Sequence, residues 1–266
     1  MFATRLISGI ILVILALLIV GRGGVMLFLA SAAISCIGLF ELYRVTKMEV
    51  RLLGAVGYAA ALAYYGLVWF QQEQFVMLVA VSALMLFMTI YVVTFPKYGT
   101  EQVTVAFFGI FYVAVMFSYL YQTRMMADGK YLVWLIFLSS WGCDTCAYCV
   151  GMLFGRHKLA PVLSPKKSIE GAVGGVVGAA LLGFLYAMFF GSYMAEVENP
   201  RAACALACGI AAVISQIGDL AASAIKRNHG VKDYGHLIPG HGGVLDRFDS
   251  MLFTAPAIYF ALTFLR

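Results

Sequence analysis

FVMLVAVSALMLFMTIYVVTF, residues 75–95, is a run of 21 residues without a single charged side chain. About 20 apolar residues in a helix are enough to cross the hydrocarbon core of a bilayer. Similar runs recur along the chain, which is 63% hydrophobic and only 12% charged. Soluble domains carry roughly 25% charged residues. The sequence therefore predicts a polytopic membrane protein and leaves no room for a soluble domain between the spans.

Hydropathy along the chain predicts an all-α integral membrane protein, a helical bundle of about nine transmembrane helices. The predicted spans are 6–21, 23–40, 52–70, 75–95, 103–123, 131–154, 171–192, 202–225 and 248–265. The weakest boundary is Gly21-Arg22-Gly23-Gly24, so eight spans with one re-entrant segment is the alternative. We expect a single membrane domain over 1–266, with a scaffold half at 1–125 and a motif-bearing half at 131–250.

The distribution of lysine and arginine predicts the orientation of these spans. The N-terminus and the loops after spans two, four, six and eight carry 13 of the 18 basic residues. Basic loops tend to stay on the cytoplasmic side, so we place these loops in the cytoplasm and the protein in the cell (inner or plasma) membrane. The net charge of +5 is spread over short loops, which favours anionic lipid head groups as partners and argues against nucleic acid.

Two patterns of small residues are interpreted as helix packing. Cys143, Cys146 and Cys149 recur every third residue inside a predicted apolar helix, where thiols serve as small packing groups more readily than as zinc ligands. The glycine-rich run at 171–178 follows no predicted strand and has small-x-x-x-small spacing. It therefore predicts close approach of two helices, and not a dinucleotide-binding loop.

Among the acidic residues within or at the ends of predicted spans, three need a particular explanation: Glu41, Asp144 and Asp219. A charged carboxylate inside the membrane costs about 3 kcal/mol on insertion scales. Asp144 and Asp219 therefore need a partner or a water-filled cavity. Glu41 ends its span, and we interpret it as a helix-end residue that reaches interfacial water and pairs with Arg44 at i+3.

The stretch SAIKRNHGVKDYGHLIPGHGGVLDRFD, residues 223–249, concentrates charge in an otherwise apolar chain. On a helix, Asp219 lies one turn from Ser223 and two turns from Lys226 and Arg227, so the four side chains share an arc. The bases at the cytoplasmic end of this helix would attract anions towards the deeper carboxylate. The mixture of acids and bases points to phosphoryl or nucleotidyl transfer. A buried structural Asp–Lys pair is the alternative interpretation.

The loop before the last span adds a glycine turn and further acids. Gly242 and Gly243 let backbone N–H groups approach an anion, and the N-terminus of the following helix favours phosphate. His241 is a candidate phosphate contact in the same turn. Asp246 and Asp249, at i and i+3, share a helix face, and N-terminal capping is the alternative role for either of them, Asp249 above all.

Together these residues form a long pattern. It consists of Asp144-x-x-Ala147-Tyr148-x-x-Gly151, Ser164-Pro165-Lys166-Lys167-Ser168-x-Glu170-Gly171, Ser223-x-x-Lys226-Arg227, Lys232-Asp233 and Pro239-x-His241-Gly242-Gly243-x-x-Asp246-Arg247-x-Asp249. The pattern resembles the signature of the phosphatidate cytidylyltransferase family, also called CDP-diacylglycerol synthases. Ser168 stands where threonine is commoner in that family, a change that keeps the hydroxyl.

The resemblance implies an Mg²⁺-dependent nucleotidyltransferase of phospholipid biosynthesis. It would transfer CMP from CTP to phosphatidic acid, giving CDP-diacylglycerol and pyrophosphate, and it would be a homodimer with a second, monovalent cation such as K⁺. Candidate metal ligands are Asp219 and Asp246, whose hard oxygen donors suit Mg²⁺, with Asp144 and Asp249 as further candidates. The candidate catalytic residues are Asp219, Asp246, Lys226 and Arg227. The candidate phosphate-binding residues are Lys166, Lys167, Arg247, Ser223, His241, Gly242 and Gly243.

Two other functions stay open at the level of sequence. A CTP-dependent kinase of polyprenols or other lipid alcohols would share the triphosphate site, although the complete Asp246-Arg247-x-Asp249 block argues against it. An ion-coupled transporter would also place Asp144 and Asp219 inside spans. However, the sequence shows no inverted repeat, and a transporter has little need for so many charges on two loops.

Overall fold

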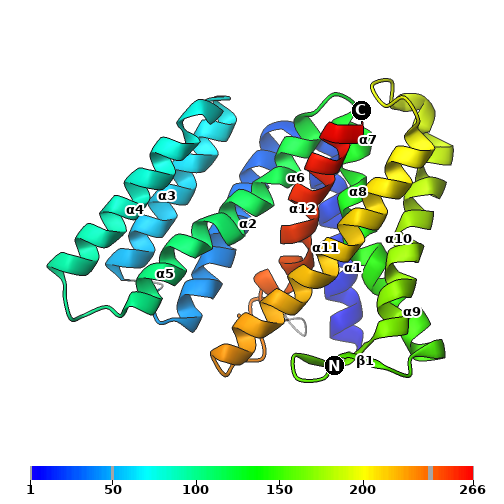
Figure 1. Cartoon of the computed structure of the whole chain (residues 1–266). Helices are drawn as coiled ribbons and strands as arrows, with labels where there is room; N and C mark the ends of the chain where they lie inside the picture. The colour runs from blue at the N-terminus through cyan, green and yellow to red at the C-terminus, as the bar shows by residue number, and fades with distance from the viewer. Residues whose placement is uncertain (1, 49–50, 239–241, 266) are drawn as a thin grey trace. The chain divides into compact units, whose positions relative to one another are not determined.

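The computed structural model describes residues 2–48, 51–238 and 242–265, with side chains from residue 9 onward. The described residues form helices and one small two-stranded sheet (Figure 1). The backbone groups into two compact units. The first comprises Met1–Ser118 and Asp233–Arg247, and the second comprises Tyr119–Lys232 and Phe248–Arg266. The predicted all-α architecture is confirmed.

The first unit is made of long apolar helices. They are α1 (Phe2–Arg22), α2 (Gly24–Val45), α3 (Leu52–Trp69), α4 (Val76–Val93, after a 3-10 turn at Glu73–Phe75) and α5 (Thr100–Gly109), which continues through a π-helical turn at Ile110–Val115 into α6 (Met116–Met125). Hydrogen bonds in the core join these helices. The Tyr43 hydroxyl donates to the Ala106 carbonyl at 2.7 Å, and the hydroxyls of Ser35 and Tyr65 lie 2.8 Å apart. These bonds tie α2 to α5 and to α3.

The boundary between α1 and α2 falls at the predicted glycine break. Gly23 and Gly24 have φ angles of 67° and 54°, in the left-handed region that residues with a Cβ rarely adopt. A regular right-handed helix cannot run through two such residues. The first two predicted spans are therefore separate helices.

The second unit carries the C-terminal helices. They are α7 (Gly129–Leu132), α8 (Trp134–Phe137), a π-helical turn (Leu138–Gly142), α9 (Cys143–Phe154), α10 (Ile169–Phe190), a 3-10 turn (Gly191–Tyr193), α11 (Pro200–Asn228) and most of α12 (Leu245–Leu265). Between α9 and α10 the chain forms a hairpin of β1 (Lys158–Ala160) and β2 (Ser164–Ser168). The strands are antiparallel, with Lys158 opposite Ser168 and Ala160 opposite Ser164.

The lengths of the helices agree with a multi-pass membrane protein. Within the described ranges, eight helices are long and apolar enough to cross a bilayer, and a shorter apolar stretch, Gly9–Arg22, lies in α1. Each of the nine predicted spans coincides with one helical segment. The observed helices extend beyond the predicted ends in places, as in α11, which begins at Pro200 and ends at Asn228.

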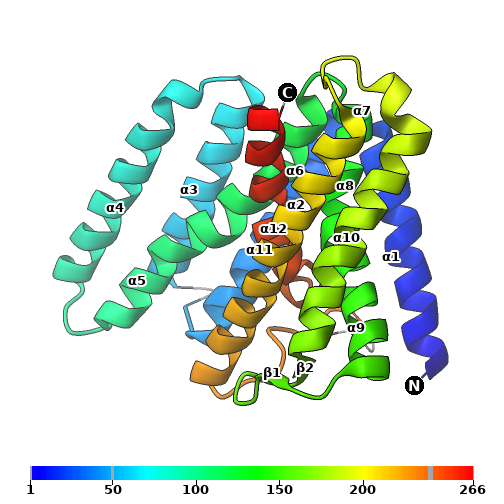
Figure 2. The same cartoon turned by 45° about the vertical axis from the view of Figure 1, so that its right-hand side comes forward.

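Close packing against α10 holds α9 and α11 in place, and the three helices lie side by side in Figures 1 and 2. A Cβ at Gly175 would lie 2.9 Å from Sγ of Cys143, and one at Gly178 would lie 2.5 Å from Sγ of Cys146. Real Cβ atoms do not approach other atoms so closely. The predicted packing roles of the glycine run and of these two cysteines are confirmed, whereas Cys149 is exposed.

Candidate functional site

An ion pair between two separate motifs forms the centre of the candidate site in the second unit. The Lys167 ammonium on β2 contacts Oδ2 of Asp219 on α11, and about a quarter of each side chain is exposed. Asp219 is therefore paired, as the cost of a carboxylate in a membrane-spanning helix requires. The pair stays accessible to a ligand because neither side chain is buried completely.

Asp144 belongs to the same charged cluster. It lies on α9, is exposed on the protein surface, and interacts electrostatically with both Lys167 and Asp219. The structure thus brings together three predicted residues from three elements. One base faces two acids, so the cluster has acceptor capacity for a further cation.

The β1–β2 hairpin presents Lys166 and Lys167, and Glu170 fixes its base. The Glu170 carboxylate accepts hydrogen bonds from the backbone N–H groups of Arg156, at 3.1 Å, and His157, at 3.2 Å. It also lies 2.6 Å from Nδ1 of the His157 ring. These contacts close the loop between α9 and α10. Glu170 was part of the recognised pattern, but its role as an anchor was not predicted.

The N-terminus of α10 begins directly behind the two lysines. Ser168 is its N-cap, and its Oγ accepts a hydrogen bond from the Gly171 N–H at 3.1 Å. Such a cap satisfies one of the N–H groups that lack an intrahelical partner. The side-chain hydroxyl at this position, which a threonine would also supply, therefore caps α10.

The predicted arc on α11 is confirmed in part. Ser223 and Lys226 are partly buried and follow Asp219 along the helix, whereas Arg227 is exposed and donates from Nη1 to the Val231 carbonyl at 3.3 Å. Arg227 thus helps to end α11. Lys166 on the hairpin is also exposed.

Asp249 is not the N-cap of the last helix, so that interpretation was wrong. α12 begins at Leu245, four residues before Asp249. The carboxylate of Asp249 instead pairs with Lys226, with 3.7 Å between Nζ and Oδ2, and it accepts the Ser250 N–H at 2.8 Å. Both members of the ion pair are about 12% exposed.

The glycine-rich loop belongs to the first unit and is folded around Asp246. Oδ2 of Asp246 accepts hydrogen bonds from the N–H groups of Tyr234, at 2.8 Å, and Gly243, at 3.0 Å. Gly242 has a φ of 88°, which favours glycine at that position. His241, the candidate phosphate contact, lies outside the described residues.

Arg247 follows Asp246 and is partly buried. Its Nε atom is buried and has no hydrogen-bond acceptor among the described residues. Leaving a buried donor unsatisfied costs about 1–3 kcal/mol, and more for a charged group. An anion bound at this side chain would remove that penalty.

Glu41 was interpreted as a helix-end residue that reaches water and pairs with Arg44; the contact with water was wrong, whereas the two charges do interact. It is buried, only 2% exposed, and accepts hydrogen bonds from the N–H groups of Val244 and Leu245. Arg44 donates to the Tyr234 carbonyl at 3.1 Å. These partners are some 200 residues away in the sequence, so local spacing could not indicate them.

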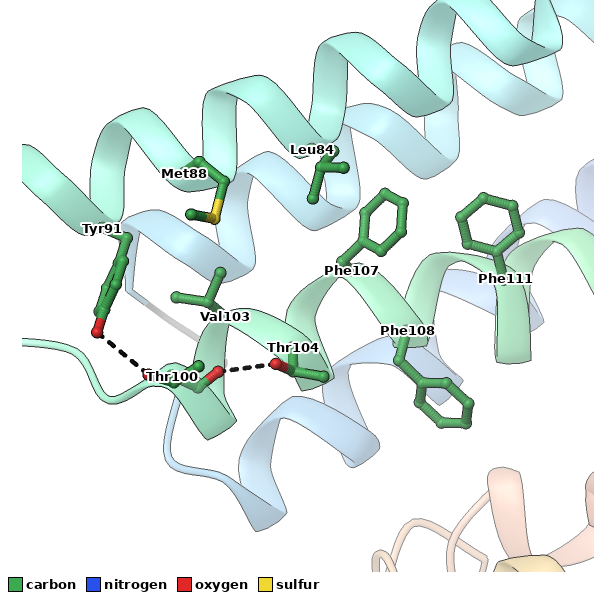
Figure 3. Close-up of a pocket in the computed structure, with 9 residues that line it drawn as sticks. All are labelled: Leu84, Met88, Tyr91, Thr100, Val103, Thr104, Phe107, Phe108 and Phe111. Carbon is green, nitrogen blue, oxygen red and sulfur yellow. Dashed lines mark hydrogen bonds between the residues drawn. The ribbon is translucent and has the colours of Figure 1, made fainter.

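A separate cavity of about 470 Å³ lies in the first unit (Figure 3). Its walls are formed by residues of α4, of α5 and of the π-helical turn that follows α5. Phe107, Phe108 and Phe111 line it opposite Leu84 and Met88. Its polar groups are hydroxyls that bond within the wall, such as Tyr91 to Thr100 at 3.1 Å. The lining holds no Asp, Glu, Lys, Arg or His, so this cavity cannot supply the charges that phosphate chemistry needs.

The donor set fits a magnesium ion that is shared with a substrate. In the part of the chain that the structure describes, no three Asp, Glu, His or Cys side chains gather into a metal site. Mg²⁺ is usually held by one or two carboxylates together with waters and substrate phosphates, so a complete protein cage is not needed. Asp219 and Asp144, with their shared lysine, provide such carboxylates in the second unit.

Comparison with known proteins identifies related sequences along almost the whole chain. Residues 3–265 match the model of the cytidylyltransferase family. The phosphatidate cytidylyltransferase of Staphylococcus saprophyticus is 33% identical over 261 residues, and that of Staphylococcus haemolyticus is 34% identical; each alignment covers 96% of both chains. The phosphatidate cytidylyltransferase of Staphylococcus aureus is 33% identical over 262 residues, again with 96% of both chains covered.

Proposed function

The chain belongs to the cytidylyltransferase family, and from this membership we propose that it is a phosphatidate cytidylyltransferase. It transfers the cytidylyl group of CTP to phosphatidic acid, which yields CDP-diacylglycerol and pyrophosphate. Three relatives that bear this name align with 96% of the chain at 33–34% identity. The membrane-spanning helices suit an enzyme whose substrate and product are both lipids.

The ion pair between Lys167 and Asp219 is the observation that carries the assignment of the site. It joins the Ser164–Ser168 strand to α11, the helix that also carries the Ser223-x-x-Lys226-Arg227 motif. A base and an acid that meet at an accessible point can exchange their mutual contact for a phosphate and a cation. A purely structural pair would not need two lysines in succession or a third charged group at Asp144.

The chemistry follows from the charges of the substrates. A phosphate oxygen of phosphatidic acid attacks the α-phosphorus of CTP, a new P–O–P bond forms, and the bond to the β-phosphate breaks. Pyrophosphate leaves with the electron pair. The attacking phosphate is largely ionised at neutral pH, since a phosphomonoester has a second pKa near about 6, so no general base is required. The protein must therefore position two anions and neutralise them.

Basic side chains perform that neutralisation in the proposed mechanism. Lys167 and Lys166 on the hairpin offer point charges to phosphate oxygens. Lys226, which pairs with Asp249, and the exposed Arg227 add two further bases at the end of α11. Arg247 offers a planar guanidinium whose buried Nε hydrogen-bonds no acceptor among the described residues, and such a donor suits bidentate binding of phosphate.

From the family resemblance we propose Asp219 and Asp246 as ligands of Mg²⁺, with Asp144 and Asp249 as further candidate ligands for it or for a monovalent cation such as K⁺. These carboxylates would hold the ion beside the substrate phosphates, where it would supply charge neutralisation in the transition state. Asp246 accepts two backbone N–H groups on Oδ2, and a carboxylate offers about four lone-pair sites in all. In this proposal the acids would hold the ion, and the bases would hold the phosphates.

Orientation and assembly belong to the same proposal. The excess of basic residues in alternate loops supports a cytoplasmic position for the hairpin and for the end of α11. CTP would then reach the site from the cytoplasm. The family resemblance supports a homodimer, which mass measurement of the detergent-solubilised protein would test.

The test of this function is pyrophosphate release from CTP by the purified protein in detergent–lipid micelles, with and without phosphatidic acid and Mg²⁺. We expect release only when both are present, and a loss of about 100-fold or more in Asp219→Asn and in Asp246→Asn. Glu73→Gln, an exposed acid in the 3-10 turn before α4, is the matched control and should keep full activity. Release that ignores phosphatidic acid, or folded protein without release, contradicts the proposal.

A further inference from the structure

Glu41 is a buried carboxylate that the proposed chemistry does not use. It lies near the C-terminal end of α2 and is 2% exposed. A buried charge is retained in a fold only when hydrogen bonds or opposite charges compensate its lost hydration. The partners of Glu41 therefore show what its carboxylate does.

Those partners are the backbone N–H groups of Val244, directly before α12, and of Leu245, the first residue of α12. Oε1 accepts the N–H of Val244 at 2.9 Å, and Oε2 accepts the N–H of Leu245 at 2.7 Å. The first N–H groups of a helix have no intrahelical acceptor and carry a partial positive charge. Glu41 thus caps α12 with both oxygens, although it lies on a helix about 200 residues earlier in the chain.

The loop before α12 is shaped to admit this carboxylate. A Cβ at Gly235 or at Gly243 would clash with Oε1 of Glu41. Arg44, one turn after Glu41, donates from Nη2 to the Tyr234 carbonyl at 3.1 Å. The last turn of α2 therefore binds both sides of the 233–247 segment.

The same segment holds Asp246. Its Oδ2 accepts the N–H groups of Tyr234, which precedes Gly235, and of Gly243. Gly235 and Gly243 are the two glycines that lie against the carboxylate of Glu41. We propose that Glu41 is a positioning residue, which fixes from α2 the backbone at Gly235 and at 243–245 and thereby sets the place of Asp246. This inference rests on the proposed function, since Asp246 is there assigned as a metal ligand.

Hydrogen exchange tests the structural part without any assay of activity. Glu41→Gln keeps the size of the side chain but removes its charge and turns an amide NH₂ toward a backbone donor. We expect the 235–247 amides to exchange at least ten-fold faster in this variant. Ser35→Ala is the matched control on the same helix, because it removes a buried bond to Tyr65 and leaves the loop untouched. Equal protection in Glu41→Gln and the wild type, or equal loss of protection in Ser35→Ala, overturns the proposal.

The Mg²⁺ concentration for half-maximal activity tests the positioning part. A smaller folded fraction lowers the maximal rate but leaves this concentration unchanged, whereas a displaced Asp246 raises it. We expect a rise of at least ten-fold in Glu41→Gln and none in Ser35→Ala. An unchanged value in Glu41→Gln contradicts the inference. If the wild type releases no pyrophosphate, the proposed function fails, and hydrogen exchange still decides the role of Glu41.

Gly235→Ala provides a second route if Glu41→Gln does not fold. The substitution keeps Glu41 but introduces a methyl group where its carboxylate lies. We expect faster exchange in the 235–247 segment and a higher Mg²⁺ requirement, as for Glu41→Gln. A Gly235→Ala protein with wild-type values of both would show that the contact has no positioning effect.

Discussion

Asp219 lies in the span formed by α11, where an isolated charge would be unfavourable, and it is stabilised by a lysine from the β1–β2 hairpin. Removing one partner of an ion pair leaves the other charge without compensation, and the cost is largest where water is scarce. Lys167 and Asp219 are about a quarter exposed, so the cost here is smaller than for a fully buried pair. The ion pair therefore stabilises the fold, yet its two charges can still part to bind a phosphate and a cation.

The two adjacent lysines of the hairpin should differ in their effect on activity. Lys167 contacts Asp219, whereas Lys166 is exposed. We expect Lys167→Gln to lower kcat/KM for CTP by about ten- to a hundred-fold, or about 1.4–2.7 kcal/mol of transition-state stabilisation. Lys166→Gln should lower it less than about five-fold, as expected for a solvent-screened charge. Equal losses of kcat/KM in the two variants would show that the contact with Asp219 gives Lys167 no special role.

Sequence could predict some of these residues but not all of their contacts. The cost of membrane burial indicated that Asp144 and Asp219 need partners, and the Ser164–Ser168 motif contained the lysine that pairs with Asp219. Glu41 was misinterpreted because its donors, Val244 and Leu245, are close only in the folded chain. A helix periodicity can show which residues share a face, but it cannot show which distant backbone groups will meet that face.

At the scale of elements, α10 is the scaffold on which the charged cluster of the second unit is built. Its glycines let α9 and α11 approach closely, and its N-cap, Ser168, ends the strand that carries Lys167. Gln216 of α11 adds a polar tie, since its amide donates to the Ala172 carbonyl at 3.0 Å. The positions of Asp144 and Asp219 therefore depend on tight helix packing.

Two glycines at the interface between α10 and α11 provide a matched test of this packing. A Cβ at Gly183 would lie 2.5 Å from the carbonyl oxygen of Cys204, whereas one at Gly209 would lie 3.5 Å from Ala180 Cβ. We expect Gly183→Ala to lower the free energy of unfolding by about 1–3 kcal/mol through overpacking. Gly209→Ala should be neutral or stabilising by up to about 1 kcal/mol, because alanine favours the helix.

Thermal unfolding of both variants in the same detergent is the measurement. A lower Tm for Gly183→Ala alone supports the packing account. Two variants with the same Tm would mean that the helices can separate at Gly183 without cost.

The elements themselves were predictable to different degrees. Every predicted span has a helix, because a continuous apolar run of about 20 residues leaves the backbone few other ways to satisfy its hydrogen bonds in a membrane. The π-helical turns at Ile110–Val115 and Leu138–Gly142 gave no signal, since they change the hydrogen bonds and not the hydropathy. The hairpin was treated as a loop, because its strands are only three and five residues long.

The order of the segments along the chain differs from their grouping into compact units. The 233–247 segment follows α11 in sequence but packs in the first unit, where Glu41 and Arg44 bind it. The first unit therefore contributes directly to the residues of the recognised pattern. From sequence, the N-terminal half was assigned as a scaffold, but the purpose of its spans stayed open, since their contribution depends on contacts between distant parts of the chain.

The orientation in the membrane yields a further prediction within the second unit. Val162, at the tip of the hairpin, is 88% exposed, and Glu196, beyond α10, is also exposed. One span, Ile169–Tyr193, separates them. In a Cys149→Ser background, an impermeant maleimide should label Val162→Cys from the cytoplasmic face of sealed vesicles and Glu196→Cys from the opposite face. Labelling of both from one face, or the reverse pattern, contradicts the proposed orientation.

The most direct measurement of the central claim follows the phosphorus of CTP into the lipid. CTP labelled with ³²P at the α-position or at the γ-position would be incubated with the purified protein, Mg²⁺ and phosphatidic acid, and the lipid product would be extracted. Cytidylyl transfer predicts label in the lipid from α-labelled CTP and none from γ-labelled CTP, whose label leaves as pyrophosphate. Label in a lipid from γ-labelled CTP would identify a kinase, and no lipid label from either would contradict the account.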